Sequence, residues 1–314
     1  MEKLPLSWCS EEIKSSAFHP VDLPLSGLTW IPTAEIPCDY SIDDLYRNLV
    51  SDYPEFVIRG LSAETAAYFQ ERGSDVVRTG AEAVVSLDHL EDMKPSVLEL
   101  ARRGGRWGRV KEILYSDINA GKLFRFINES AHAPEPRLSH LFRSGFDQST
   151  RCFVLTNDKD GWLGAVTISS PRQPHAHTEL ILRSRSAPVG VMEAIFVSLM
   201  RTLKDEGYSH FSLGEVPFIS SESGDSVPGL SGLYLKEYIF QSERFHKLSF
   251  NYKGLYDFKN KFGPKWQPVY LAAKPALSWR LMLDLYFKSR YFDLSLFKFI
   301  DTIKKKTPDY LKTG

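Results

Sequence analysis

The stretch 177–218 constrains the fold of this chain more strongly than any other part of the sequence. Residues 178–182 form a short run suited to a buried strand, and a loop containing Pro188 and Gly190 follows. From 191 to 206, apolar residues recur at spacings of three and four, which predicts an amphipathic helix. Strand, loop and helix in this order predict one unit of an α/β fold.

The helix is predicted to stop at Gly207, and residues 210–213 predict a second strand. We expect the chain to leave the sheet at 214–217, Gly-Glu-Val-Pro. Backbone N–H groups at the start of such a helix bind anions or polarise carbonyls. The loop 185–190, Arg-Ser-Ala-Pro-Val-Gly, is similar to the Arg-x-x-Gly-x-Gly turn that holds acyl-CoA pyrophosphate in Gcn5-type acyltransferases, with Pro188 at the first glycine position. An ordinary strand-to-helix loop is the alternative interpretation.

The rest of the chain predicts more units of the same kind. Residues 1–40 are rich in proline, show no periodicity and indicate an extended arm. The elements predicted after the arm are a helix at 41–50, a strand at 56–59, a helix at 63–72, one or two strands at 75–87, a helix at 95–103, a strand at 109–114, an interrupted helical segment at 123–143 and a hairpin of strands 151–156 and 162–169.

The segment 252–272 reads YKGLYDFKNKFGPKWQPVYLA and carries the most specific pattern of the chain. In its order of residues it resembles the C-terminal catalytic domain of phosphatidylglycerol lysyltransferases, the multiple peptide resistance factor family. The segments that share this resemblance are 80–87, the basic region 102–111, 179–183, 187–190, 211–214, Pro217 and 252–272. The resemblance covers about residues 55–273, and the chain is identified as a soluble stand-alone member of the family.

This resemblance implies an α/β (α+β) fold of two tandem Gcn5-type acyltransferase-like domains, each with a mixed central sheet flanked by helices. We expect a first domain at 1–125 that includes the proline-rich arm, a second at 126–273 that carries the active site, and a basic aromatic helical tail at 274–314. The implied activity moves an aminoacyl group from a charged tRNA to a polar-lipid hydroxyl. Its co-substrate is the aminoacyl-tRNA, and no cofactor is expected.

The family's catalytic residues carry over to Arg183 and Lys259, with Lys261 as the fallback for the lysine. Glu179 is the candidate acidic residue, although the family has Asp three residues before the arginine and Glu179 stands four before Arg183. Because side chains alternate along a strand, either a bulge returns Glu179 to the site or its role is lost. The predicted substrate-binding residues are Glu82, Arg185, Gly190, Gly214, Glu215 and Lys261.

Glu215 occupies a position where the lipid enzymes commonly have an apolar residue. A carboxylate at the end of a strand, beside the site, is able to bind the ammonium of an aminoacyl group, or it caps a turn. His175 and His177 alternate before the central strand, but no Cys or carboxylate stands at metal-ligand spacing from them, so we expect no metal site.

The link 102–109 places four arginines beside a tryptophan. Arg102, Arg103 and Arg106 are therefore candidate tRNA phosphate contacts, with a ring available for base stacking. The alternative is a basic helix end that the macrodipole favours.

Charge is unevenly distributed along a chain of 314 residues with formal net charge zero. Residues 240–314 hold 15 Lys or Arg and 6 Asp or Glu, and the preceding residues hold 24 and 33. A basic end suggests an anionic partner, either nucleic acid or a membrane surface, against the alternative of a solvated basic face. The tail interleaves aromatic and basic residues, which is typical of the membrane interface or of helices that cap the second domain.

Three widely separated cysteines, Cys9, Cys38 and Cys152, suggest a reducing compartment. No signal peptide and no apolar run of the roughly 18 residues that span a bilayer is evident, so we expect a cytoplasmic protein, at most peripheral to the membrane. No stable protein partner is predicted. The polar segment 219–231 is either a lid over the site or a surface loop.

Three functions stay open. The first is transfer from aminoacyl-tRNA to a polar-lipid hydroxyl, as in phosphatidylglycerol lysyltransferases. The second is an acyl-CoA-dependent N-acyltransferase, in which acetyl-CoA serves the loop 185–190. The third is a non-catalytic module that binds tRNA or an anionic membrane.

Overall fold

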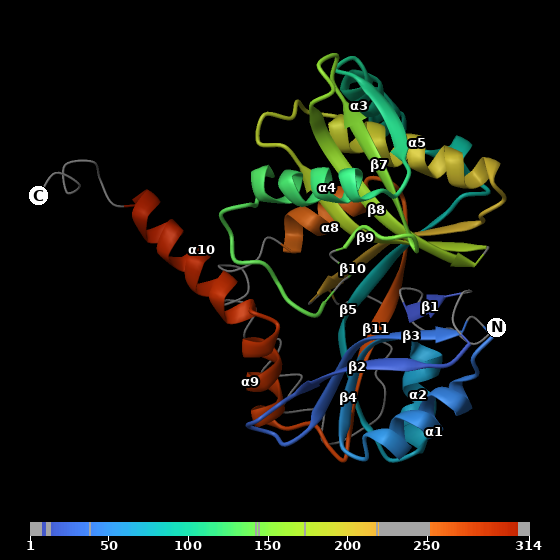
Figure 1. Cartoon of the computed structure of the whole chain (residues 1–314), viewed down its shortest axis with the longest axis vertical. Helices are drawn as coiled ribbons and strands as arrows, with labels where there is room; N and C mark the ends of the chain where they lie inside the picture. Colours follow the sequence, from blue (N-terminus) through green and yellow to red (C-terminus); the bar gives the residue numbers. More distant parts are fainter. Residues whose placement is uncertain are drawn as a thin grey trace, which may run out of the picture.

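The computed structural model describes residues 8–10, 14–37, 39–141, 143, 145–172, 174–217, 219 and 252–306. Within these residues one 11-stranded sheet runs through the molecule in the order β1-β3-β4-β11-β5-β10-β9-β8-β7-β6, and β2 pairs with β3 (Figure 1). The strands are β1 Cys9–Ser10, β2 Ala17–Asp22, β3 Thr29–Pro37, β4 Phe56–Leu61, β5 Asp75–Ser86, β6 Arg109–Ile113, β7 Thr150–Thr156, β8 Trp162–Arg172, β9 His175–Arg183, β10 His210–Pro217 and β11 Lys265–Lys274. The helices are α1 Ile42–Asp52, α2 Ala63–Glu71, the 3₁₀ turn η2 Leu90–Asp92, α3 Pro95–Gly105, α4 Asp117–Glu129, α5 Val191–Asp205, α8 Tyr252–Asn260, α9 Trp279–Lys288 and α10 Tyr291–Lys306.

The sheet has helices on both faces in each half of the molecule. In the lower half of Figure 1, α1 and α2 pack on one face and α9 on the other. In the upper half, α4 covers one face and α3 and α5 cover the other. Apolar side chains alternate between these layers because successive strand residues point to opposite faces. The predicted α/β class, with mixed sheets flanked by helices, is confirmed.

The two halves exchange elements. Strand β11 follows the upper-half helices in sequence, yet it lies antiparallel between β4 and β5 in the lower half. Conversely, β6 precedes the second half in sequence but pairs with β7 at the upper edge. Strand β5 joins the halves, because it pairs with β11 on one side and β10 on the other. The predicted boundary near residue 125 falls inside α4, and the domain limits stay a prediction.

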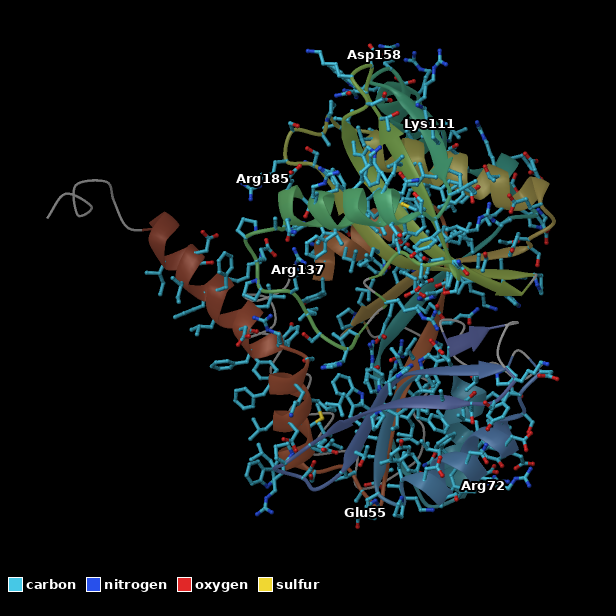
Figure 2. The ribbon with its side chains drawn as sticks, viewed as in Figure 1. Glu55, Arg72, Lys111, Arg137, Asp158 and Arg185 are labelled. Atoms are coloured by element: carbon cyan, nitrogen blue, oxygen red, sulfur yellow. The ribbon has the colours of Figure 1, made fainter. Side chains whose placement is uncertain are left out.

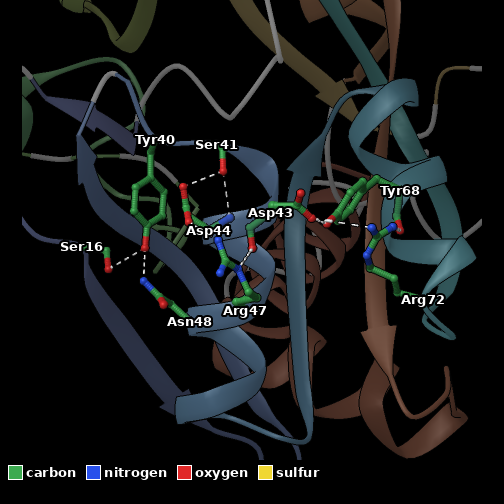
Figure 3. Close-up of polar contacts among 9 residues, drawn as sticks. All are labelled: Ser16, Tyr40, Ser41, Asp43, Asp44, Arg47, Asn48, Tyr68 and Arg72. Atoms are coloured by element: carbon green, nitrogen blue, oxygen red, sulfur yellow. Dashed lines mark hydrogen bonds and ion pairs between the residues drawn. The ribbon is translucent and has the colours of Figure 1, made fainter.

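Serine caps define the starts of several helices. The Ser41 side chain accepts a hydrogen bond from the Asp44 backbone N–H at the start of α1 (Figure 3). Ser62 and Ser116 cap α2 and α4 in the same way. A side-chain oxygen here satisfies an N–H that has no partner within the helix, so these boundaries follow from local sequence.

The prediction of an N-terminal arm is wrong, because residues 17–37 belong to the sheet. Strand β3 pairs parallel with β4 and antiparallel with β2, and its Trp30 is fully buried. The prediction that the chain leaves the sheet at 214–217 is also wrong. Strand β10 continues to Pro217 beside β5 after an irregularity between Ser212 and Glu215. The predicted helical segment 123–143 is shorter, since α4 starts at Asp117 and ends at Glu129.

The tail packs on the first half through α9, which differs from the alternative that its helices cap the second half. Leu281 of α9 packs under the lower sheet, and the buried carboxylate of Asp284 accepts hydrogen bonds from the Ser26 backbone N–H and hydroxyl, both at 2.8 Å. Helix α10 then leads away from the body (Figure 1). Among the described helices, none combines the length and apolarity needed to cross a bilayer. Apart from Ile219, the predicted lid 219–231 lies outside the described residues.

Candidate active site

The site lies where two parallel neighbours, β9 and β10, part from each other. They are paired from His175 and His210 to His177 and Ser212. Beyond this point, in the described residues, β9 continues beside β8 and β10 continues beside β5. Ligands bind in α/β sheets where neighbouring strands diverge at their carboxyl ends, because backbone groups and side chains there face an opening. Predicted site residues on both strands therefore come to one place.

Lys259 enters this opening from α8. Its Nζ donates a hydrogen bond to the Glu215 backbone carbonyl at 3.1 Å, and the residue is only 3% exposed. Burial lowers the pKa of Lys259 to about 8, although the charges of Glu215 and Glu82 act in the opposite direction. A lysine with such a pKa exchanges protons readily near neutral pH, which suits acid–base chemistry.

The absence of a side chain at Gly214 leaves space for the amine of Lys259. Its φ of +86° lies in the left-handed region, and a Cβ at this position would lie 3.4 Å from Nζ of Lys259. A larger residue is therefore disfavoured both by backbone conformation and by the approach of the amine. The predicted pair Gly214 and Lys259 is thus brought together.

A second polar group beside Lys259 joins β5, β9 and β10. The Glu82 Oε1 accepts from the Ser212 hydroxyl at 2.5 Å and lies 3.2 Å from Nδ1 of His177. Burial alone would raise the pKa of Glu82, but hydrogen bonds from His177 and Ser212 hold it below its usual value. From its sequence context His177 is a candidate only as a metal ligand, and its alternation with Glu179 is the signal that could have placed it here.

Glu179 sits on a β-bulge. Strand β8 pairs Thr167 with Leu180 and Ile168 with Thr178, so Glu179 is the extra residue of β9. A bulge at this residue was one of the two alternatives that the sequence left open. Its buried carboxylate accepts from the Ser169 hydroxyl at 2.7 Å and from the Arg143 backbone N–H at 3.2 Å. The catalytic role of Glu179 stays a prediction.

Glu215 already has a cationic partner. Its Oε2 lies 2.5 Å from Nη2 of Arg59, with side chains 18% and 22% exposed, and its Oε1 accepts from the Thr79 hydroxyl at 3.3 Å. The other terminal nitrogen of Arg59 donates to the Leu141 carbonyl. A donor ammonium that binds Glu215 must therefore compete with Arg59. The predicted recognition role stays a prediction.

Arg183 and Arg185 lie apart from this cluster. Arg183 is exposed at the end of β9, five residues beyond Thr178 and thus roughly 16 Å along the strand. Arg185 is exposed on the outer edge of the upper half (Figure 2), and its Nε donates to the Ser130 carbonyl at 3.4 Å.

Lys261 forms an ion pair at 3.0 Å with Glu193, a buried residue of α5. These positions leave Lys259 as the predicted lysine that reaches the opening between β9 and β10.

Gly190 begins α5 in direct contact with the backbone of α3. Its φ is +97°, and a Cβ added there would lie 2.2 Å from the Leu100 carbonyl oxygen. A Cβ at Gly104 would lie 2.0 Å from the Gly190 carbonyl oxygen. The two glycines therefore permit close packing of α3 on α5, and α3 fills space beside the loop that resembles a pyrophosphate cradle.

The predicted tRNA contacts lie at the exposed end of α3. Arg102, Arg103 and Arg106 are exposed, and the Trp107 ring beside them is 57% exposed. Arg102 pairs with Glu99 at 2.8 Å on the same helix. An exposed aromatic ring among arginines fits nucleic-acid contact, and this role stays a prediction.

The fold and the site together are those of a mixed α/β sheet whose parallel strands β9 and β10 part beside a buried lysine. Residues 134–273 match the family model described as "Phosphatidylglycerol lysyltransferase, C-terminal". This match covers less than half of the chain, and it agrees with the sequence resemblance. The family is one of transferases, in agreement with the predicted class.

Individual known proteins are similar to this chain in sequence or in structure. The chain is 31% identical over 93 residues to the phosphatidylglycerol lysyltransferase of Bacillus subtilis (strain 168), a match that covers 27% of this chain and 10% of that protein. The structure of L-PGS from Bacillus licheniformis is similar with a TM-score of 0.65 at 19% identity, covering 90% of this chain and 87% of that one. The C-terminal domain of a putative lysylphosphatidylglycerol synthetase from Agrobacterium fabrum gives 0.61 at 22%, covering 82% and 83%. These structures share the fold across most of the chain.

Proposed function

We propose that this chain transfers an amino acid from aminoacyl-tRNA to a polar-lipid hydroxyl, with phosphatidylglycerol as the first acceptor to test. The observation that carries the proposal is the buried Lys259 amine, held at the opening between β9 and β10 within the segment that matches the family. An aminoacyl ester is already activated. The enzyme therefore has to position the acceptor, stabilise the carbonyl oxyanion and move one proton.

Lys259 is suited to the oxyanion step. Its amine is desolvated and fixed by the Glu215 carbonyl, so its charge acts in a low-dielectric setting without first being reorganised. Burial lowers the pKa of Lys259 to about 8, and the charges of Glu215 and Glu82 oppose this effect, so the amine stays mostly protonated at neutral pH. Such a group stabilises negative charge that develops on a carbonyl oxygen.

The donor tRNA is proposed to lie along the end of α3. There the exposed arginines and Trp107 offer phosphate contacts and a stacking surface. This end of α3 packs on the start of α5, the helix that follows β9, and so belongs to the same half as the site. Binding through phosphate contacts is expected to weaken steeply with salt.

The acceptor side is proposed to be an anionic membrane surface that α9 and α10 contact. Large apolar side chains on these helices are exposed, namely Trp279, Phe287, Phe292, Leu296, Phe299, Ile300 and Ile303. On α10, residues 292, 296, 299 and 303 follow the spacing of one helical face. Exposed Arg280, Lys288 and Arg290 accompany them. Apolar insertion beside basic residues is the chemistry of a peripheral, anionic-membrane-binding helix.

The acyl-CoA alternative has weaker support. Its cradle would be the loop 185–190, where Pro188 lacks an N–H and Gly190 is packed against the α3 backbone. The non-catalytic alternative shares the tRNA and membrane surfaces, but it gives no reason to bury a lysine between two strands.

The test is incubation of the purified chain with a mixture of radiolabelled aminoacyl-tRNAs and phosphatidylglycerol vesicles, followed by lipid extraction and chromatography. The proposal expects a labelled lipid with wild type and none with Lys259→Met. Label released only as free amino acid, or no lipid product under any donor, would contradict it. Stabilisation by acetyl-CoA in a thermal unfolding assay would favour the acyl-CoA alternative, and salt-sensitive tRNA binding without turnover the binding module.

A further inference from the structure

We propose that His177, oriented by Glu82, is the general base that removes the proton from the acceptor hydroxyl and returns it to the departing ribose oxygen. This inference rests on the proposed function and assigns a residue to its proton transfer. The cluster that supports it consists of His177 on β9, Glu82 on β5 and Ser212 on β10, and the three meet at the point where β9 and β10 part.

The two ring nitrogens of His177 have different surroundings. Nδ1 lies 3.2 Å from the Glu82 carboxylate and 3.1 Å from the Ser212 hydroxyl. In the part of the chain that the structure describes, Nε2 makes no hydrogen bond, and the ring is 20% exposed. A carboxylate on Nδ1 fixes the tautomer with the proton on that nitrogen, which leaves Nε2 free to accept one.

The Glu82 carboxylate is itself held in place. Its Oε1 receives the Ser212 hydroxyl, and the same hydroxyl oxygen accepts from the Gly214 backbone N–H at 3.0 Å. Gly214 is also the residue over which Lys259 lies. The orienting carboxylate, the point where β9 and β10 part and the lysine are therefore linked through one short run of β10. A rigid scaffold thus positions both the proposed base and the lysine that stabilises the oxyanion.

Several charged groups face His177. Glu82 approaches from β5, Glu179 from β9 itself and Lys259 from α8, whereas β10 and β8 contribute the non-titrating Ser212 and Ser169. Burial and Lys259 act to lower the pKa of His177, but Glu82 and Glu179 outweigh them and raise it. A base with a raised pKa is stronger, and it becomes half protonated at a higher pH.

The proposed transfer uses no reagent besides the acceptor and the aminoacyl-tRNA. The acceptor O–H gives its proton to Nε2 of His177 while its oxygen forms a bond to the aminoacyl carbonyl carbon. The resulting oxyanion is stabilised by Lys259. When the carbonyl re-forms, the bond to the ribose oxygen breaks, and the imidazolium returns the proton to that oxygen. One ester is exchanged for another, and His177 ends in its starting state.

His175 provides a matched control. It lies two residues earlier on β9, and its ring packs at a tilt against His210 with ring centroids 5.0 Å apart. His177→Ala is expected to lower kcat by about 10²–10⁴-fold with little change in the donor KM, whereas His175→Ala should stay within about twofold. Added imidazole should restore part of the His177→Ala activity. Equal losses in the two variants, or full activity in His177→Ala, would overturn the assignment.

Glu82→Gln separates a positioning role from simple structural support. The variant keeps a hydrogen-bond acceptor for His177 but removes the negative charge, so the acid limb of the kcat profile should move to lower pH. An unchanged limb would contradict the pairing. His177→Gln, compared with wild type in thermal unfolding, shows whether lost activity reflects lost folding.

The transfer assay distinguishes a wrong assignment of the base from a wrong proposed function. If wild type makes aminoacyl lipid and His177→Ala matches it, the function stands and the base is another group. If wild type transfers nothing, the function fails and the base role fails with it. In either case, NMR titration of the His177 ring in wild type and Glu82→Gln decides whether the carboxylate raises its pKa.

Discussion

Lys259→Met should make the protein more stable at neutral pH while removing its activity. The methionine side chain is close in length and apolar, so it fills the space of a residue that is 3% exposed. Because burial lowers the pKa of Lys259 from 10.5 to about 8, the folded protein disfavours the charged amine by about 3 kcal/mol. The variant loses one hydrogen bond to the Glu215 carbonyl, which contributes about 1 kcal/mol. The net gain at pH 7 is therefore about 2 kcal/mol.

The stability difference between wild type and Lys259→Met depends on pH. Between the folded pKa of about 8 and the unfolded value of 10.5, the unfolded chain binds more protons, so wild-type stability contributed by Lys259 rises with pH. Below pH 8 the cost of the buried charge is fully present. The advantage of Lys259→Met should therefore shrink by about 2–3 kcal/mol between pH 7 and pH 10.

Urea unfolding of wild type and variant at both pH values measures this difference. Lys265→Met is the control, because Lys265 is exposed and its replacement should change neither stability nor its pH dependence by more than about 0.5 kcal/mol. A Lys259→Met variant that is less stable than wild type at pH 7, or whose difference does not vary with pH, would refute the account of a desolvated lysine.

Three further predictions concern residues outside this lysine. Arg183→Ala tests the catalytic role that the resemblance implies for a side chain outside the Lys259 cluster: that role predicts a loss of transfer of at least about tenfold, and full activity would contradict it. Because the side chain is exposed, the unfolding free energy should change by less than about 0.5 kcal/mol. Glu215→Gln should reduce kcat/KM for lysyl-tRNA relative to alanyl-tRNA by about ten- to a hundredfold, whereas an equal change for both donors would assign Glu215 to Arg59 alone. Phe299→Asp with Ile303→Asp should abolish sedimentation with anionic vesicles at unchanged stability, and retained binding would exclude this face of α10.

Local sequence signals predicted most helices and strands of this fold. The period of apolar residues from 191 to 206 predicts α5, and Ser41 marks the start of α1. These features depend on residues close in sequence. The insertion of β11 between β4 and β5 depends instead on pairing between residues far apart in sequence, such as Leu271 with Arg59, which periodicity does not encode. The N-terminal strands were missed because prolines mask the alternation of β3.

The candidate site was also predictable from the sequence only in part. The resemblance predicted Lys259 and Gly214, which the structure brings close together, and the strand register shows that Glu179 lies on a bulge. The ion pair of Glu215 with Arg59 joins residues 156 positions apart, so only the folded chain reveals it. His177 was missed for a related reason, since its partner Glu82 lies on a different strand.

Lys259 is proposed to serve transfer from aminoacyl-tRNA to lipid. The most direct measurement is the single-turnover rate of labelled lysyl-tRNA with phosphatidylglycerol vesicles, for wild type, Lys259→Met and Lys265→Met at matched folded concentration. We expect labelled lipid from wild type and Lys265→Met, and a rate at least about a hundredfold lower for Lys259→Met. Equal rates in all three, or no lipid product from wild type with any aminoacyl-tRNA, would contradict the account.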